Sequence, residues 1–63
     1  MKELDMVRLT SDFHGLAAGT IGTIVLEYDG TAFEVEYFDS NGDTIDFFTT
    51  PADKIELVIA YCP

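Results

Sequence analysis

The sequence predicts an all-β fold, a small five-stranded barrel with one helical turn before the last strand. Short segments in which apolar and polar residues alternate follow one another along the chain. The stretch Gly19–Leu26 places two glycines three residues apart at the start of a β-branched run, which suits a sharp turn into a packed strand. Asp29-Gly30 and Asn41-Gly42 supply two hairpin turns between the later segments.

The first expected strand covers residues 4–9, with Val7 and Leu9 facing the core. A loop of about nine residues follows, which is longer than an ordinary hairpin connection. Its apolar residues Phe13 and Leu16 are expected to fold back as a lid over one end of the barrel. Long loops on small domains often carry recognition, so this loop is also a candidate for binding.

The second expected strand, residues 20–28, needs an irregularity because its apolar residues do not alternate strictly. Ile21 and Ile24 are three residues apart, so a bulge or kink at Gly22 would turn both inward. The third strand, residues 31–38, has the cleanest alternation in the chain. We therefore expect one of its faces to be buried and the other to be solvated.

The fourth expected strand covers residues 44–49, and the fifth covers residues 54–60. Between them, Thr50 can cap a single helical turn that begins at Pro51, since proline is tolerated at a first helical position. Five short strands, one long loop, two tight hairpins and one helical turn match a small SH3-like barrel. The expected inward-facing set is Ile24, Phe33, Val35, Tyr37, Ile45, Phe47, Ile55 and Leu57.

Length and charge limit the classes of function. Sixty-three residues are expected to form one domain, residues 1–63, with a thin core. Three cations stand against twelve carboxylates, which gives a formal net charge of -9. A negative field repels phosphates and anionic headgroups, so nucleic acid and membrane surfaces are poor partners. A basic protein surface would be attracted instead.

The cysteine content and the hydropathy of the sequence indicate the compartment and the redox state of the protein. Cys62 is the single cysteine and has no partner for an internal disulfide. The chain shows no cationic and apolar leader and no apolar run approaching the length of a membrane span. We therefore expect a cytoplasmic protein with a reduced thiol.

Three patterns that could carry chemistry are better explained as turns or loops. The glycines of segment 15–22 lack the Lys-Ser/Thr pair and the positive charge of a phosphate-binding loop. Segment 39–43 offers hard oxygens, but its glycine and acidic residues do not have the spacing of a calcium loop. His14 has no nucleophile near it in sequence. We expect no catalytic residue, no metal and no cofactor.

The carboxylates are the most informative group. The period of two turns a set of acidic residues outward, together with the apolar residues of the same alternating sets. One interpretation is a solvated face that keeps a thin-cored protein soluble. The other is a protein-binding face in which apolar groups anchor an electrostatic contact. The candidate binding residues are Glu27, Glu34, Glu36, Phe38, Asp46, Phe48 and Glu56.

Four stretches also carry a resemblance. Asp5-Met-Val-Arg-Leu9, Gly19-Thr-Ile-Gly-Thr-Ile-Val25, a Phe-Glu-Val-Glu-Tyr strand and a Thr-Pro-Ala-Asp-Lys turn stand at intervals along the chain. Together they resemble a family of short bacterial proteins catalogued only as a domain of unknown function, from residue 2 to about residue 58. The glycine segment is similar to the KOW motif of ribosomal and transcription-elongation barrels. The resemblance implies an SH3-like fold and no catalytic residue.

Two hypotheses follow. In the first, the chain is a non-enzymatic binding protein, an antitoxin or immunity protein, whose acidic face masks a basic surface of a partner. Small acidic proteins paired with a toxin or nuclease are the analogy for this hypothesis. A homodimer through Phe38 and Phe48 is a further use of the same face. In the second, a KOW-like accessory domain contacts RNA or a ribonucleoprotein through Arg8, Phe13 and the loop of residues 10–19.

Overall fold

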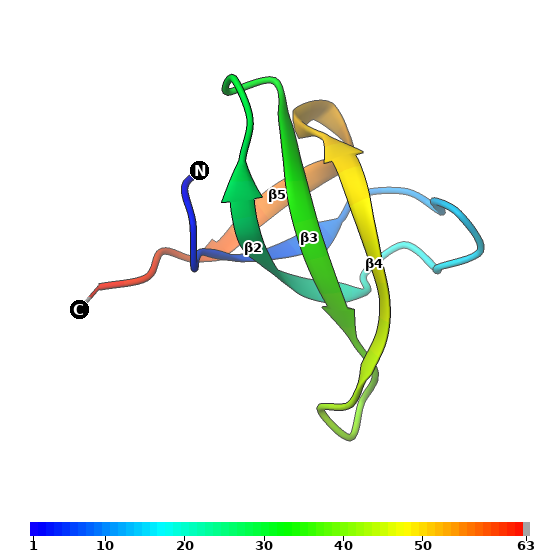
Figure 1. Cartoon of the computed structure of the whole chain (residues 1–63). Helices are drawn as coiled ribbons and strands as arrows, with labels where there is room; N and C mark the ends of the chain where they lie inside the picture. The colour runs from blue at the N-terminus through cyan, green and yellow to red at the C-terminus, as the bar shows by residue number, and fades with distance from the viewer. Residues whose placement is uncertain (63) are drawn as a thin grey trace.

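Five antiparallel strands form one bent sheet in the computed structural model, which describes residues 1–62 (Figure 1). The elements are β1 (Met6–Leu9), β2 (Ile21–Glu27), β3 (Ala32–Phe38), β4 (Thr44–Pro51), the 3-10 turn η1 (Ala52–Lys54) and β5 (Ile55–Ile59). Their order in the sheet is β4-β3-β2-β1-β5, so the first and last strands are neighbours. The predicted all-β class, five strands and single helical turn before the last strand are confirmed.

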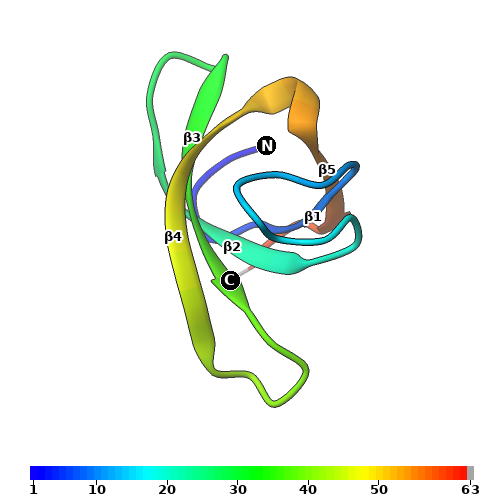
Figure 2. The same ribbon diagram turned by 90° about the vertical axis from the view of Figure 1, so that its right-hand side faces the viewer.

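The sheet bends around the core. Figure 2 shows β3 and β4 on one side of the molecule and β1 and β5 on the other. Buried side chains from both sides form one core cluster. Alternating apolar residues of β1 and β3 supply most of the core, because every second side chain of a strand faces the same way. The buried apolar residues are Val7, Leu9, Ile24, Phe33, Val35, Tyr37 and Ile55. All seven were predicted to face inward.

The irregularity of β2 lies at a different residue from the one predicted. Its register against β3 shifts between Ile24 and Leu26, so Val25 has no direct partner. Ile24 remains buried, but Leu26 moves to the outer side of the sheet. Ile21 is half-buried and also lies on the outer side, so the expectation that a kink at Gly22 turns it inward is wrong.

Strand β4 has the opposite orientation to the prediction. Ile45 and Phe47, which were assigned to the core, are exposed. Phe48 packs against the core instead, and Thr50 is fully buried. The burial of Thr50 is tolerated because its hydroxyl forms a 2.6 Å hydrogen bond with the Tyr37 hydroxyl. Thr50 therefore belongs to the core and does not cap η1, which has no side-chain cap.

Strand β5 is buried only at its start. Ile55 belongs to the core as predicted, whereas Leu57, which was also predicted to face inward, is exposed, and so is Ile59. The register of β5 against β1 shifts between Met6 and Val7, so Leu57 pairs with Val7 and Ile59 pairs with Met6. The shift turns Ile59 to the outer side, while Leu57 shares the side of Val7 without being covered.

The long first loop contains a tight hairpin that covers the core. The backbone N–H of Phe13 donates to the Leu16 carbonyl at 2.9 Å, and the Leu16 N–H donates to the Phe13 carbonyl at 2.8 Å. His14 and Gly15 between them have φ values of 49° and 83°, as a two-residue hairpin turn requires. Phe13 and Leu16 pack against the core, which confirms the predicted lid. The His14 ring stacks on Phe48 at 4.6 Å between centroids.

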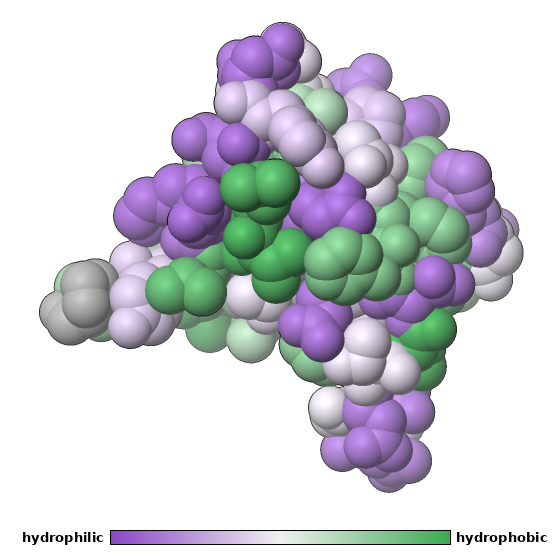
Figure 3. All heavy atoms as spheres, viewed as in Figure 1, coloured by the Kyte–Doolittle hydropathy of each residue, from purple (hydrophilic) through white to green (hydrophobic). Residues whose placement is uncertain are grey.

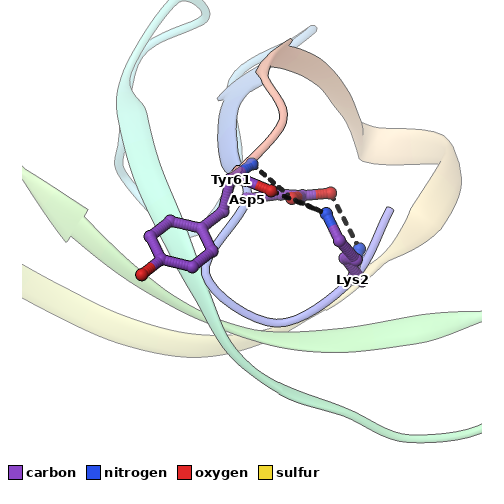
Figure 4. A network of polar contacts seen from close by, with 3 residues as sticks. All are labelled: Lys2, Asp5 and Tyr61. Atoms are coloured by element: carbon purple, nitrogen blue, oxygen red, sulfur yellow. Dashed lines mark hydrogen bonds and ion pairs between the residues drawn. The ribbon is translucent and has the colours of Figure 1, made fainter. Parts of the chain in front are cut away.

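Asp5 holds the two ends of the described chain together (Figure 4). Its buried carboxylate accepts hydrogen bonds from the Lys2 ammonium at 2.9 Å, the Lys2 backbone N–H at 3.0 Å and the Tyr61 backbone N–H at 2.9 Å. These bonds, from the Lys2 side chain first and the Tyr61 N–H second, lower the pKa of Asp5 to about 2. An ionised carboxylate therefore fixes both terminal segments beside β1.

Candidate functional site

The seven predicted binding residues divide between the two sides of the sheet. Directly paired residues of antiparallel strands point to the same side, so the register assigns a side to each one. The residues on the outer side are Glu34, Glu36, Phe38 and Glu56. The residues on the side of the core are Glu27, Asp46 and Phe48.

The outward orientation predicted for these last three residues is wrong. Glu27 pairs with buried Phe33, and Asp46 pairs with buried Tyr37, so both lie at the rim of the core side. Phe48 packs against the core, with its ring centroid 6.3 Å from that of Tyr37. The prediction assigned the residues of β4 to the wrong sides of the sheet, and it did not locate the register shift in β2. These three residues therefore do not extend the acidic face.

Glu56 faces outward as predicted, but its charge is compensated. The Arg8 Nε donates to Glu56 Oε1 at 2.7 Å, and both side chains are about half exposed. Strand β5 lies across the core from β3, as Figure 2 shows, so Glu56 belongs to a different surface from Glu34. The same pairing occupies Arg8, one of the two residues on which an RNA contact was expected to depend.

Glu34 and Glu36 form the centre of the candidate site, on the outer side of β3. Glu34 Oε1 accepts hydrogen bonds from the hydroxyl of Thr49 at 2.6 Å and from that of Tyr28 at 3.2 Å. Glu36 Oε2 accepts one from the Thr44 hydroxyl at 2.7 Å. Hydroxyl donors orient a carboxylate without neutralising it. Within residues 1–62 neither of the two carboxylates forms an ion pair.

Exposed apolar side chains lie on both sides of these carboxylates. Leu26 of β2 pairs with Glu34 and is 44% exposed, and Phe47 of β4 pairs with Glu36 and is 51% exposed. Figure 3 shows hydrophobic and hydrophilic residues interleaved over the surface of β2, β3 and β4. We call this surface the Glu34–Glu36 face, and define it by Leu26, Tyr28, Glu34, Glu36 and Phe47. Phe38, the next outward residue of β3, is half-buried at its border.

Three members of this face, Leu26, Tyr28 and Phe47, were not among the predicted binding residues. Phe47 was assigned to the core on the assumption of uninterrupted alternation, whereas Leu26 and Tyr28 were given no role at the site. In β4 the neighbouring residues Phe47 and Phe48 give each side of the strand one aromatic ring, so hydropathy contains no signal for choosing between them. In β2 the broken alternation of apolar residues predicted an irregularity in the strand, but it did not show at which residue the irregularity lies.

The described residues form an open surface, and the acidic turn that they contain is stabilised by its own hydrogen bonds. No pocket is found in them, and residues 1–62 contain no cluster of three or more groups that could hold a metal ion. The Asp39 carboxylate accepts hydrogen bonds from the backbone N–H groups of Asn41 at 2.9 Å and Asp43 at 3.0 Å, so it stabilises its own hairpin turn. The described part of the chain has no helix of the length and apolarity needed to cross a membrane.

Fold and surface together define a class: a small all-β domain that presents an acidic and apolar sheet face to its surroundings. Comparison with known families assigns the domain to one of them. A family model described as "Domain of unknown function (DUF4926)" matches residues 3–57, and the chain belongs to this family. The predicted resemblance to a family of unknown function is thereby confirmed. No curated protein and no solved structure matches the chain.

Proposed function

We propose that the chain is a non-enzymatic protein-binding module whose Glu34–Glu36 face masks a basic surface of a partner protein, in the manner of an antitoxin or immunity protein. One observation carries this proposal. Two carboxylates are held in place by hydroxyl donors, form no ion pair within residues 1–62, and lie between exposed apolar side chains. Such a surface is complementary to one that carries both cations and apolar groups.

The two kinds of side chain have different tasks in this proposal. The carboxylates, within a chain of net charge -9, attract a cationic partner and accelerate the encounter. Lysine or arginine side chains of the partner then bond the free carboxylate oxygens, which the threonine hydroxyls keep oriented. Burial of Phe47 and Leu26 slows dissociation, because removing apolar area from water stabilises the complex.

We also propose that the domain is an SH3-like barrel with a KOW-like glycine segment at the start of β2. The strand order, the long first loop, the two tight hairpins and the 3-10 turn between β4 and β5 support this proposal. The placement of Gly22 within β2 supports the second part of it, since the glycine segment leads directly into this strand.

The experiment begins with affinity capture of a partner from the native host, followed by calorimetric titration of that partner over about 0.05 to 0.5 M salt. The double substitution Glu34→Lys with Glu36→Lys is expected to weaken binding by about 100-fold or more and to flatten its salt dependence. Phe47→Ala is expected to weaken binding while leaving the salt dependence unchanged, because it removes apolar area and no charge.

A matched control separates this face from the overall charge. Glu3→Lys with Asp53→Lys makes the same change in net charge at two exposed positions outside the face, and should retain most of the affinity. Equal losses from the two double variants would show that overall charge, and not this face, drives binding. Unchanged binding after the reversal of Glu34 and Glu36 would reject the proposal. Retardation of mixed RNA in a low-salt gel shift would favour the RNA-binding alternative instead.

A further inference from the structure

Strand β5 is an edge strand with exposed apolar side chains. Within residues 1–62 it pairs with β1 alone, at one end of the sheet. Leu57 is 47% exposed, Val58 is 38% exposed and Ile59 is 62% exposed. Edge strands that remain unpaired in solution are usually protected by lysine, proline or an inward-pointing charge. The single charged residue of β5 is Glu56, whose carboxylate is already paired with Arg8.

The distribution of charge indicates which partner suits this edge. Residues 54–62 contain one cation, Lys54, and one carboxylate, Glu56, so the segment is neutral in a chain of net charge -9. The other edge strand, β4, carries Asp46 and follows a hairpin that contains Asp39 and Asp43. The local charges of two copies would therefore be repulsive at β4, whereas those at β5 would add nothing to the repulsion between the two chains.

We propose that two copies of this chain associate through β5, with the two strands pairing antiparallel about a two-fold axis. An antiparallel edge is complementary to itself, which is the requirement for a closed symmetric dimer. The register shift of β5 leaves Val58 without a direct partner on β1 and bends the strand, so the ladder between copies is short. Contact among Leu57, Val58 and Ile59 of the two copies therefore supplies much of the stability.

The first test is sedimentation equilibrium of the full chain between about 10 μM and 1 mM. A species of twice the 7.0 kDa chain mass is expected as concentration rises, and added salt should strengthen its formation by screening the net charge. Ile59→Lys should weaken this association by about tenfold or more, because it places like charges in the contact. Phe47→Lys makes the same change in charge on the Glu34–Glu36 face and should leave the association within about twofold.

Two further measurements make the outcome decisive. Circular dichroism reports whether each variant is folded, and Val58→Lys replaces Ile59→Lys if the latter unfolds. On the unchanged chain, hydrogen exchange of the β5 amides that face away from β1 should slow as concentration rises. A monomer at every concentration, or a dimer that Phe47→Lys disrupts and the two β5 variants do not, would overturn the proposal. No captured partner is used, so this result is independent of the function proposed above.

Discussion

Gly22 of β2 lies where β2 and β3 approach each other closely beside the Glu34–Glu36 face. A Cβ atom at Gly22 would lie 2.6 Å from Val35 Cγ1 and 2.9 Å from the carbonyl oxygen of Glu36. Both distances are shorter than any normal contact, so a larger residue would push β2 and β3 apart. The absence of a side chain at Gly22 therefore permits the close spacing of β2 and β3 beside Glu36.

We expect Gly22→Ala to lower the free energy of unfolding by about 2 to 3 kcal/mol, because the added methyl group overpacks a site that has no room for it. Urea denaturation followed by circular dichroism measures the change. Gly15→Ala is the matched control: its φ of 83° disfavours alanine, but the space around it is open. This control should cost about 1 kcal/mol. Equal losses at the two positions would contradict the role given to the close approach at Gly22.

At the scale of elements, the orientation of β4 decides which residues form the site. Phe48 faces the core because the lid places the His14 ring against it at 4.6 Å, and Thr50 faces the core because Tyr37 bonds its hydroxyl. Phe47 is consequently turned to the outer side, beside Glu36. The orientation of one strand thus follows from contacts with two other parts of the chain.

This dependence explains how much of the structure the sequence could predict. Alternation identified the core side of β1 and β3 correctly, because in β3 the opposite side carries Glu34 and Glu36, which are unsuited to burial. The same two carboxylates were therefore predicted to face outward. In β4 both sides were compatible with burial. The side that faces the core is the one that carries Phe48, which stacks with His14, and Thr50, whose hydroxyl bonds that of Tyr37. Contacts between distant segments of this kind leave no periodic signal in a sequence.

The terminal segments are an element-scale case in which a charge holds backbone in place. The pKa of Asp5 is lowered from its usual value of 3.8 to about 2, so the folded state binds its proton more weakly than the unfolded state does. This contribution to stability is complete above the unfolded value. It is lost as the pH falls through the folded value, which places the loss between about pH 4 and pH 2.

We accordingly expect the free energy of unfolding of the native chain to exceed that of Asp5→Asn near neutral pH, and the difference to shrink as the pH falls from about 4 to 2. Urea denaturation of both proteins at a series of pH values measures this difference. Glu3→Gln removes a charge from an exposed neighbour and should give a curve close to that of the native chain. A difference that stays constant down to pH 2 would contradict the assignment of the lowered pKa to Asp5.

At the scale of the whole molecule, the net charge of -9 acts on folding and on binding in opposite ways. Twelve carboxylates on a 63-residue chain repel one another in the compact state more than in the expanded one. The thin core, which has seven buried apolar side chains within residues 1–62, must offset this repulsion. The same field attracts a basic partner. Salt therefore stabilises the fold and weakens the proposed complex.

We expect the free energy of unfolding to rise by about 1 kcal/mol between about 0.05 and 0.5 M sodium chloride, as screening shortens the range of the repulsion. Glu3→Lys with Asp53→Lys changes the net charge from -9 to -5, since each substitution adds two positive charges, and should reduce this rise. Urea denaturation at each salt concentration gives both values. A fall in stability with salt would mean that the Lys2–Asp5 and Arg8–Glu56 ion pairs outweigh the overall repulsion. In that case the charges of the folded chain would stabilise it overall, and repulsion among the carboxylates would not limit its free energy of unfolding.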